Sequence, residues 1–160
     1  MNNAVVIVTG GSRGIGRAVC ERFADSGAQV VAAARSAKEL DETCALIKAR
    51  GGLCHVQVTD VGSADEIEAL IEGTHRRFGR IDVLVNNAGV ALQAAIEDLD
   101  ESFFETLMLV NVQAVYRGCR AVWPVMRRQG GGVIVNLSSL ASVDPFPGFT
   151  AYGAAKAWVN

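Results

Sequence analysis

The sequence is poor in the residues that build metal centres. Its 160 residues include four cysteines and two histidines. The cysteines lie far apart with no Cys-x-x-Cys pair, at Cys20, Cys44, Cys54 and Cys119, and this spacing argues against a zinc site. A chain of this length buries roughly 70% of the surface that it exposes when unfolded, so its core requires neither a metal nor a disulfide. We therefore predict no metal site.

Long apolar runs and an excess of one charge are also lacking. The longest uninterrupted apolar runs are Ala4 to Val8 and Val30 to Ala34, far short of the ~20 residues that span a bilayer. No basic stretch precedes the first run, so we predict no membrane span and no export signal, and we expect a cytoplasmic location. The net charge is −2 and the basic residues are scattered, which argues against a nucleic-acid or membrane-surface partner.

Short apolar runs alternate with helical segments along the chain. The runs at 4–8 and 29–34 lack the polar alternation of a half-exposed strand, which is typical of parallel strands covered by helices on both faces. The same pattern predicts strands at 53–58, 83–85 and 133–137, with helices between them. This order predicts a doubly wound parallel sheet in three α/β/α layers, forming one domain over residues 1–160.

The predicted helix from about Asp100 to Gln129 is unusually apolar. Apolar side chains lie nearly all round its circumference, more than one face of a monomer would bury, which makes the helix a candidate subunit interface. Pro124 lies inside the same segment and should kink the helix or end it locally. The apolar side chains are Phe103, Phe104, Leu107, Met108, Leu109 and Val110.

A glycine-rich segment follows the first predicted strand and opens the first predicted helix. Glycines permit a tight turn and a close approach to a pyrophosphate, while the helix N-terminus presents free N–H groups. The string alone could be an ordinary turn, but a strand before it and a helix after it favour dinucleotide binding. The segment reads Thr9, Gly10, Gly11, Ser12, Arg13, Gly14, Ile15, Gly16.

The end of the second strand bears on the choice of cofactor. An NAD enzyme commonly places an acid there against the ribose 2′-hydroxyl, whereas this chain has Ala34 followed by Arg35. Arg35 and Arg13 offer two guanidinium groups that can pair with a 2′-phosphate. We therefore expect NADP(H) to be favoured over NAD(H). The alternative is that both arginines are solvated surface groups.

A second group of candidate residues lies near the end of the sequence. Lys156 follows Tyr152 by four residues, so on a helix the two side chains share one face. An ammonium there can stabilise the phenolate and lower the tyrosine pKa from its usual ~10, which would let Tyr152 donate or accept a proton. A tyrosine beside a solvated lysine often arises by chance. The position after the fifth strand, where open α/β sheets bind ligands, favours catalysis.

These motifs, in this order, resemble the short-chain dehydrogenase/reductase family, in particular its NADP-preferring members of the 3-oxoacyl-acyl-carrier-protein reductase type. The resemblance covers essentially the whole chain and implies a Rossmann-type fold. It rests on the glycine motif, on Asn86-Asn87-Ala88-Gly89 after the fourth strand, on Asn111, and on Ser139, Tyr152 and Lys156.

The resemblance also implies residue roles. Tyr152 would be the catalytic acid/base, and Lys156 would support it and hold the nicotinamide ribose. Ser139 would orient the substrate carbonyl, and Asn111 would support a proton relay. Taken singly, such residues could also be ordinary capping, turn or buried polar groups. The implied cofactor contacts are Gly10, Ser12, Arg13, Gly14, Ile15, Gly16, Arg35, Asp60, Val61, Asn87, Ala88, Gly89, Tyr152 and Lys156.

Members of this family usually run to about 250 residues. We therefore expect this chain to be C-terminally truncated, without the final strands of the sheet and the loop that closes over substrate. The leading hypothesis is hydride transfer between NADP(H) and a small carbonyl or secondary alcohol substrate. The alternatives are an NADP-binding fragment or sensor without turnover, and a methyltransferase on the same sheet architecture. The full-length chain would form a homodimer or homotetramer through the long helix.

Overall fold

The computed structural model describes residues 3–160, which contain a parallel sheet of five strands. The strand order is β3-β2-β1-β4-β5, and every neighbouring pair is parallel. Strands β2 and β3 lie on one side of β1, and β4 and β5 lie on the other, so the direction of the strand order reverses between β1 and β4. The strands are β1 (Val5–Thr9), β2 (Gln29–Ala34), β3 (Leu53–Val58), β4 (Val83–Asn86) and β5 (Val133–Asn136). The predicted strands are confirmed, with ends displaced by one residue at most.

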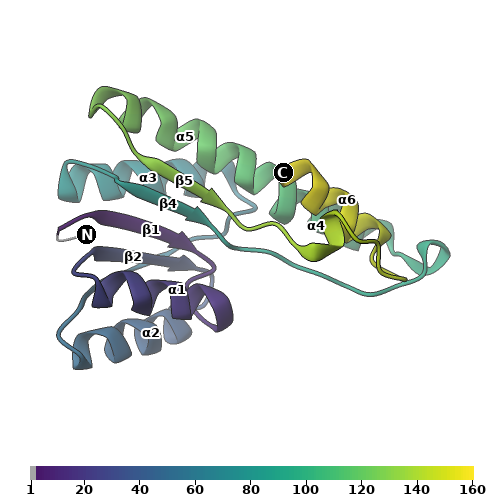
Figure 1. Ribbon diagram of the computed structural model, residues 1–160, viewed down its shortest axis with the longest axis horizontal. Coiled ribbons are helices and arrows are strands. Elements are labelled where there is room, and N and C mark those ends of the chain that lie inside the picture. The colour runs from purple at the N-terminus through teal and green to yellow at the C-terminus, as the bar shows by residue number, and fades with distance from the viewer. Residues whose placement is uncertain (1–2) are drawn as a thin grey trace.

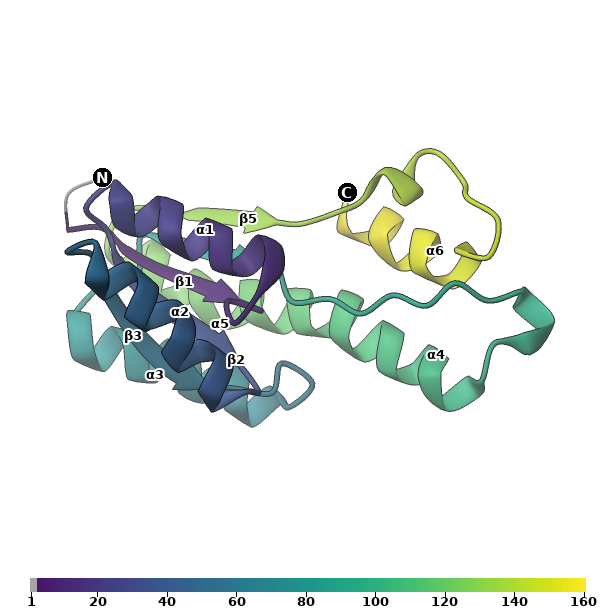
Figure 2. The ribbon, with the colours of Figure 1, turned by 90° about the horizontal axis from the view of Figure 1, so that it is seen from below.

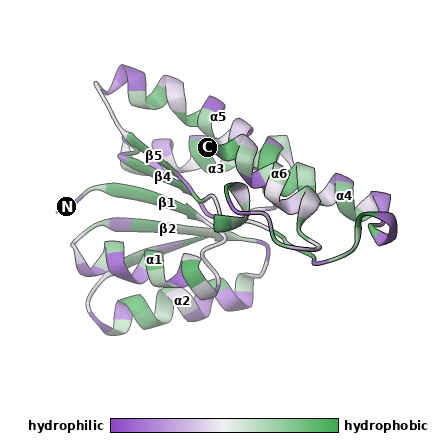
Figure 3. Ribbon diagram, turned by 45° about the vertical axis from the view of Figure 1, so that its right-hand side comes forward, coloured by the Kyte–Doolittle hydropathy of each residue, from purple (hydrophilic) through white to green (hydrophobic). Residues whose placement is uncertain are grey.

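Helices cover both faces of this sheet (Figure 1). Helices α1 (Gly14–Asp25) and α2 (Ala37–Ala49) pack on one face, and α3 (Ala64–Phe78) and α5 (Ala114–Arg128) pack on the other. Successive strand residues point to opposite faces, and in the central strands β1, β2 and β4 both sets are mostly apolar because helices cover both faces (Figure 3). The edge strands β3 and β5 are more exposed. The prediction of a three-layer, Rossmann-type α/β fold is therefore confirmed.

The long helical region has three parts rather than one. Helix α4 (Glu101–Met108) leads into a π-helical segment, η2 (Leu109–Gln113), and then into α5. The helix does not end at Pro124 but continues to Arg128, because a proline removes one backbone hydrogen bond while its neighbours stay packed on the sheet. Among residues 3–160, no helix has both the length and the apolar character needed to cross a membrane.

The last helix, α6 (Thr150–Val159), lies beyond the carboxyl ends of the strands. It packs against α4 and η2 through a small apolar cluster that includes Leu107, Val112 and Ala155. The segment that follows β4 runs out from the sheet between α6 and the α4–α5 helix (Figure 2). Two short 3₁₀ turns, η1 (Ile96–Asp98) and η3 (Leu140–Ser142), complete this region. The segment that follows β4 thus lies beside α6.

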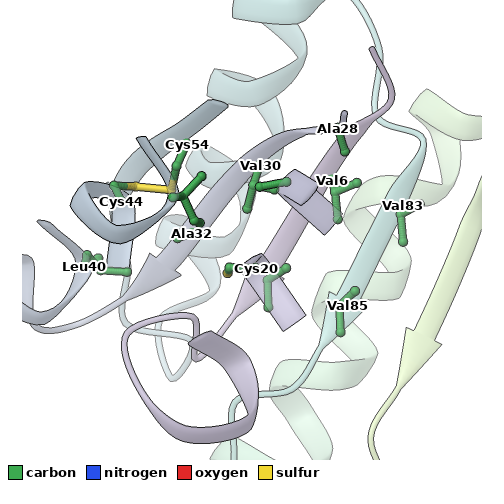
Figure 4. Packing of buried hydrophobic residues seen from close by; sticks show 13 residues of the cluster. Val6, Cys20, Ala28, Val30, Ala32, Leu40, Cys44, Cys54, Val83 and Val85 are labelled. Carbon is green, nitrogen blue, oxygen red and sulfur yellow. A yellow bond between two sulfur atoms is a disulfide. The ribbon is translucent and has the colours of Figure 1, made fainter. Parts of the chain in front are cut away.

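Two of the four cysteines are joined, although they are ten residues apart in the sequence. A disulfide links Cys44 of α2 to Cys54 of β3, with Cα atoms 5.1 Å apart (Figure 4). The spacing of the cysteines in the sequence did not predict this pair. The β-α connection brings α2 back over the strand that follows it, which places the two side chains in one buried cluster. Cys20 and Cys119 are free.

Candidate active site

A cleft of about 390 Å³ opens at the carboxyl ends of the strands, on both sides of the point where the strand order reverses. Its walls come from the segments that follow β1, β2, β3 and β4. In open α/β sheets this is where ligands bind, because the loops after adjacent strands diverge to opposite faces there. The volume falls within the usual range for small-molecule sites.

The glycine loop after β1 forms the floor of this cleft. Gly10 and Gly14 adopt positive φ angles of 67° and 54°, which favour glycine. A Cβ on Gly16 would collide with the carbonyl of Gly10. Helix α1 begins directly after Arg13, which makes no side-chain cap. The first N–H groups of α1 are therefore left for an anion at the helix N-terminus.

Asn87 and Thr9 brace the glycine loop against the end of β4. The amide Nδ2 of Asn87 donates to the carbonyl oxygens of Thr9, at 2.8 Å, and of Gly10, at 3.3 Å. The Thr9 hydroxyl accepts from the backbone N–H groups of Asn87 and Ala88, both at 3.1 Å. These bonds hold the two loops at a fixed separation across the mouth of the sheet. The glycine motif in the sequence does not indicate this bracing role of the Thr9 hydroxyl.

The predicted cofactor residues gather in the cleft. Apart from Tyr152 and Lys156, all of them line it except Gly14, which lies at the start of α1. Arg13 and Arg35 are exposed at its rim. The carboxylate of Asp60 accepts from the backbone N–H of Gly62 at 2.9 Å and so shapes the turn after β3. Residues that line the cleft but were not predicted are Ala34, Ser36, Glu39, Thr59, Val90 and Val110.

Glu39 is the most informative of the residues that the sequence analysis missed. Its pattern with Ser36 predicts a capping box, Ser-x-x-Glu, in which the glutamate side chain would bond the N–H of the cap residue. In the structure Ser36 does cap α2, but the carboxylate of Glu39 accepts from the hydroxyl of Ser12 at 3.1 Å instead. The Ser-x-x-Glu pattern therefore gives no indication of the hydrogen bond between α2 and the glycine loop.

Tyr152 and Lys156 lie one helical turn apart on α6. The Nζ of Lys156 is 5.9 Å from the centroid of the Tyr152 ring and donates to the carbonyl of Leu137 at 2.8 Å. Ser138 bonds the other end of the same lysine, its hydroxyl donating to the Lys156 carbonyl at 3.0 Å. Lys156 is only 4% exposed, and this burial lowers its pKa. The end of β5 thus fixes the position of the ammonium group.

Asn111 lies in the π-helical segment η2 and is fully buried. Its Nδ2 donates to the carbonyls of Val90, at 2.8 Å, and Leu107, at 3.0 Å, while its Oδ1 has no partner. A Cβ on Gly89 would lie 2.9 Å from this Oδ1 and 3.6 Å from the Nζ of Lys156. Asn111 and Lys156 therefore flank Gly89. An unpaired buried carbonyl is costly unless it serves a ligand or a water.

Ser139 lies three residues after the end of β5 and caps the short turn η3. Its hydroxyl accepts from the N–H of Ala141 at 3.2 Å, which leaves the hydroxyl proton free to be donated. The predicted site residues thus form two groups in space: the cofactor residues that line the cleft, and the residues that follow β5 or lie on η2 and α6. Gly89 connects the two groups, because it lines the cleft and lies beside both Asn111 and Lys156.

The residues present fit a bound dinucleotide. Gly10, Gly16 and Gly89 line the cleft and have no room for a side chain, because a Cβ there would lie within 3 Å of Asn87, the Gly10 carbonyl or Asn111. Helix α1 offers an uncapped N-terminus, and the Oδ1 of Asn111, next to Gly89, has no partner. These two unpaired features cost stability in the absence of a ligand. Residues 3–160 contain no cluster of three or more His, Cys, Asp or Glu side chains placed to hold a metal.

Several known proteins are similar in sequence to this chain. The family model for short chain dehydrogenases matches residues 4–160. The chain is 39% identical to the 2-(R)-hydroxypropyl-CoM dehydrogenase of Xanthobacter autotrophicus, over 95% of this chain and 62% of that protein. It is 35% identical to the 3-oxoacyl-[acyl-carrier-protein] reductase FabG of Thermotoga maritima, over 99% of this chain and 65% of that protein. The chain thus spans less than two thirds of these relatives.

Solved structures share the fold over the same residues. A metagenomic short-chain oxidoreductase in complex with NADP is 37% identical, with a TM-score of 0.96, over 100% of this chain and 73% of that one. A short-chain dehydrogenase/reductase from Burkholderia phymatum in complex with NAD is 30% identical, with a TM-score of 0.95, over 99% of this chain and 57% of that one. On its sequence and its fold, the chain belongs to the short-chain dehydrogenase/reductase family.

Proposed function

We propose that this chain supplies the cofactor site and the proton-transfer group of an oxidoreductase that moves a hydride between NADP(H) and a carbonyl or secondary alcohol. One observation carries the proposal. Tyr152 and Lys156 lie one turn apart on α6, and the Lys156 ammonium and Asn111 lie beside Gly89, which lines the cleft. A tyrosine and a buried lysine at the end of a dinucleotide-sized cleft form an acid/base group next to a cofactor.

The cleft residues account for cofactor binding. Gly10, Gly16 and the N-terminus of α1 would hold the pyrophosphate, and the segment Asn87 to Gly89 would lie along the adenosine with Asp60 and Val61 near the adenine. Arg13 and Arg35 would pair with a 2′-phosphate, which favours NADP(H). When bound, the cofactor supplies or accepts the hydride.

The protein's own residues would manage the proton. In reduction, the Tyr152 hydroxyl gives its proton to the substrate oxygen, and in oxidation it takes the proton back. The Lys156 ammonium, held by the Leu137 carbonyl, stabilises the tyrosine oxygen once the proton has left. The Ser139 hydroxyl donates to the substrate oxygen and orients it. The Oδ1 of Asn111, which has no partner within the chain, would accept a hydrogen bond from a water that connects it to Lys156.

The test compares Tyr152→Phe with Tyr116→Phe in the full chain. The sequence contains two tyrosines, and Tyr116 is 52% exposed on α5 and outside the cleft. We expect Tyr152→Phe to lower the rate of carbonyl reduction at least ~100-fold while NADPH binding stays within about threefold, and Tyr116→Phe to change neither. A Tyr152→Phe chain as active as the parent would overturn the mechanism.

The substrate panel should include a 3-oxoacyl thioester, a small ketone and a secondary alcohol, since named relatives act on 3-oxoacyl and 2-hydroxypropyl groups. Reduction of either carbonyl compound with NADPH, or oxidation of the alcohol with NADP+, supports the oxidoreductase. Binding of NADPH with no turnover of the whole panel would instead support the alternative, a dinucleotide-binding module without catalysis.

We further propose that the full-length protein self-associates through the long helix. Three large side chains of that region are exposed: Phe104 at 41%, Tyr116 at 52% and Trp123 at 60%. Phe104 lies on α4 and the other two on α5, and exposed aromatic groups along one helical region are typical of subunit interfaces. Light scattering behind size exclusion should give a mass at least twice that of one chain, and a monomer at micromolar concentration would contradict the proposal.

A further inference from the structure

A carboxylate lies in the same part of the cleft as the two arginines. Glu39, in the first turn of α2, lines the cleft together with Arg13, Arg35 and Ser36. Its Oε2 accepts a hydrogen bond from the Ser12 hydroxyl at 3.1 Å. This end of the cleft therefore contains two positive groups and one negative group, and not the purely basic surface that Arg13 and Arg35 alone would make.

The backbone around Glu39 is held firmly in place. The carbonyl of Glu39 accepts from the Thr43 hydroxyl at 3.1 Å and from Nη2 of Arg17 at 3.4 Å. Arg17 also donates to the Ser12 carbonyl at 2.7 Å, and Thr43, which is fully buried, donates to the same carbonyl at 3.0 Å. These bonds tie the start of α2 to the glycine loop. The carboxylate therefore occupies a preorganised position in the cleft.

The charge of Glu39 is not cancelled by an ion pair. In residues 3–160 the acidic partner of Arg17 is Glu42, at 3.4 Å, and neither Arg13 nor Arg35 forms a salt bridge. An unpaired carboxylate repels a phosphate nearby and accepts a hydrogen bond from a hydroxyl. Glu39 therefore acts against a 2′-phosphate and in favour of a free 2′-hydroxyl, which is opposite to the effect of the arginines.

We propose that Glu39 is a specificity-determining residue that narrows the preference of this site for NADP(H) over NAD(H). The inference rests on the proposed function, because it concerns the same cofactor site. The arginines attract the 2′-phosphate and Glu39 offsets part of that attraction, so the chain prefers NADP(H) over NAD(H) by less than the two arginines alone would give. The acid that the end of β2 lacks is supplied instead from the first turn of α2.

The test uses two fragments that differ only in the 2′-phosphate, adenosine 2′,5′-bisphosphate and adenosine 5′-monophosphate, titrated by calorimetry. Glu39→Gln keeps the size of the side chain and an oxygen for the Ser12 hydroxyl. We expect this variant to bind the bisphosphate about tenfold more tightly, which corresponds to 1.4 kcal/mol, with the monophosphate changed less than threefold. Titrations with NADPH and NADH should show the same change in ratio.

Asp41→Asn is the matched control. Asp41 lies two residues further along α2, is exposed and does not line the cleft, so this variant loses the same charge away from the site and should leave the ratio unchanged. Glu39→Asp keeps the charge and should stay close to the parent, and Glu39→Ala removes the charge a second way. Circular dichroism checks the fold of each variant.

The outcomes separate this inference from the proposed function. If the unchanged chain binds neither the fragments nor the dinucleotides, the proposed function fails. If the chain binds them but Glu39→Gln and Glu39→Ala leave the bisphosphate-to-monophosphate ratio within twofold of the parent, the role of Glu39 is refuted. An equal change in Asp41→Asn would also refute it, because the effect would then come from the net charge of the chain.

Discussion

Reduction of the disulfide between Cys44 and Cys54 should lower the stability of the chain measurably. The bridge closes a loop between residues ten apart, and the chain-entropy relation for a loop of that length gives about 2.5–3 kcal/mol. The bridge joins α2 to β3 next to Leu40 and Ile47 in the core, so its loss also loosens the attachment of α2. For a domain of this size the expected decrease in melting temperature is about 5–10 °C.

The assay is urea unfolding followed by far-ultraviolet circular dichroism, with and without dithiothreitol. Thiol titration of the unreduced, denatured chain should find two reactive groups, Cys20 and Cys119, and four after reduction. In the native state Cys20 should not react, because burial raises its pKa to about 12. The double variant Cys44→Ala/Cys54→Ala should be insensitive to dithiothreitol. Four thiols before reduction, or a stability difference below about 1 kcal/mol, would refute the reasoning.

Two further substitutions test the glycine loop and the loss of stability at acid pH. Gly16→Ala should weaken NADPH binding at least tenfold in a fluorescence titration, because the new Cβ would collide with the Gly10 carbonyl. Gly73→Ala, whose Cβ would come no closer than 4.0 Å to its nearest neighbour, the Arg76 side chain, should leave binding unchanged. Burial opposes ionisation of Asp82, but the Arg80 guanidinium and a backbone N–H hold its pKa below the usual value. Its contribution to stability is therefore present above about pH 4 and lost as the pH falls further, so Asp82→Asn should flatten the loss of unfolding free energy between about pH 5 and 3. An equally steep loss in that variant would contradict the assignment.

Much of the fold could be predicted because its signals are local. Strands buried on both faces need apolar side chains at every position, and runs such as Val5 to Val8 satisfy that need without any information on neighbours. The order of strands and helices then restricts the topology, since parallel crossovers are right-handed. The glycine loop was predicted for a similar reason, because positive φ angles at Gly10 and Gly14 are a property of single residues.

The site was predicted less completely, because contacts between distant segments leave no local pattern. Glu39 looks like a capping residue in the sequence, and only the packing of α2 on the glycine loop turns it toward Ser12. No run of residues marks the π-helical turn that buries Asn111 beside Gly89. The position of the Lys156 ammonium depends on a carbonyl at the end of β5, nineteen residues earlier in the chain.

The sequence by itself determined the order of strands and helices, the glycine loop and the tyrosine-lysine pair on one helical face, because apolar runs, glycine and a four-residue spacing act over a few residues. Only the tertiary structure decided which charges meet in the cleft, which carbonyl holds Lys156 and which cysteines are joined. The physical reason is that a hydrogen bond, an ion pair or a disulfide depends on distances of a few ångströms, and the fold sets those distances between segments far apart in the chain.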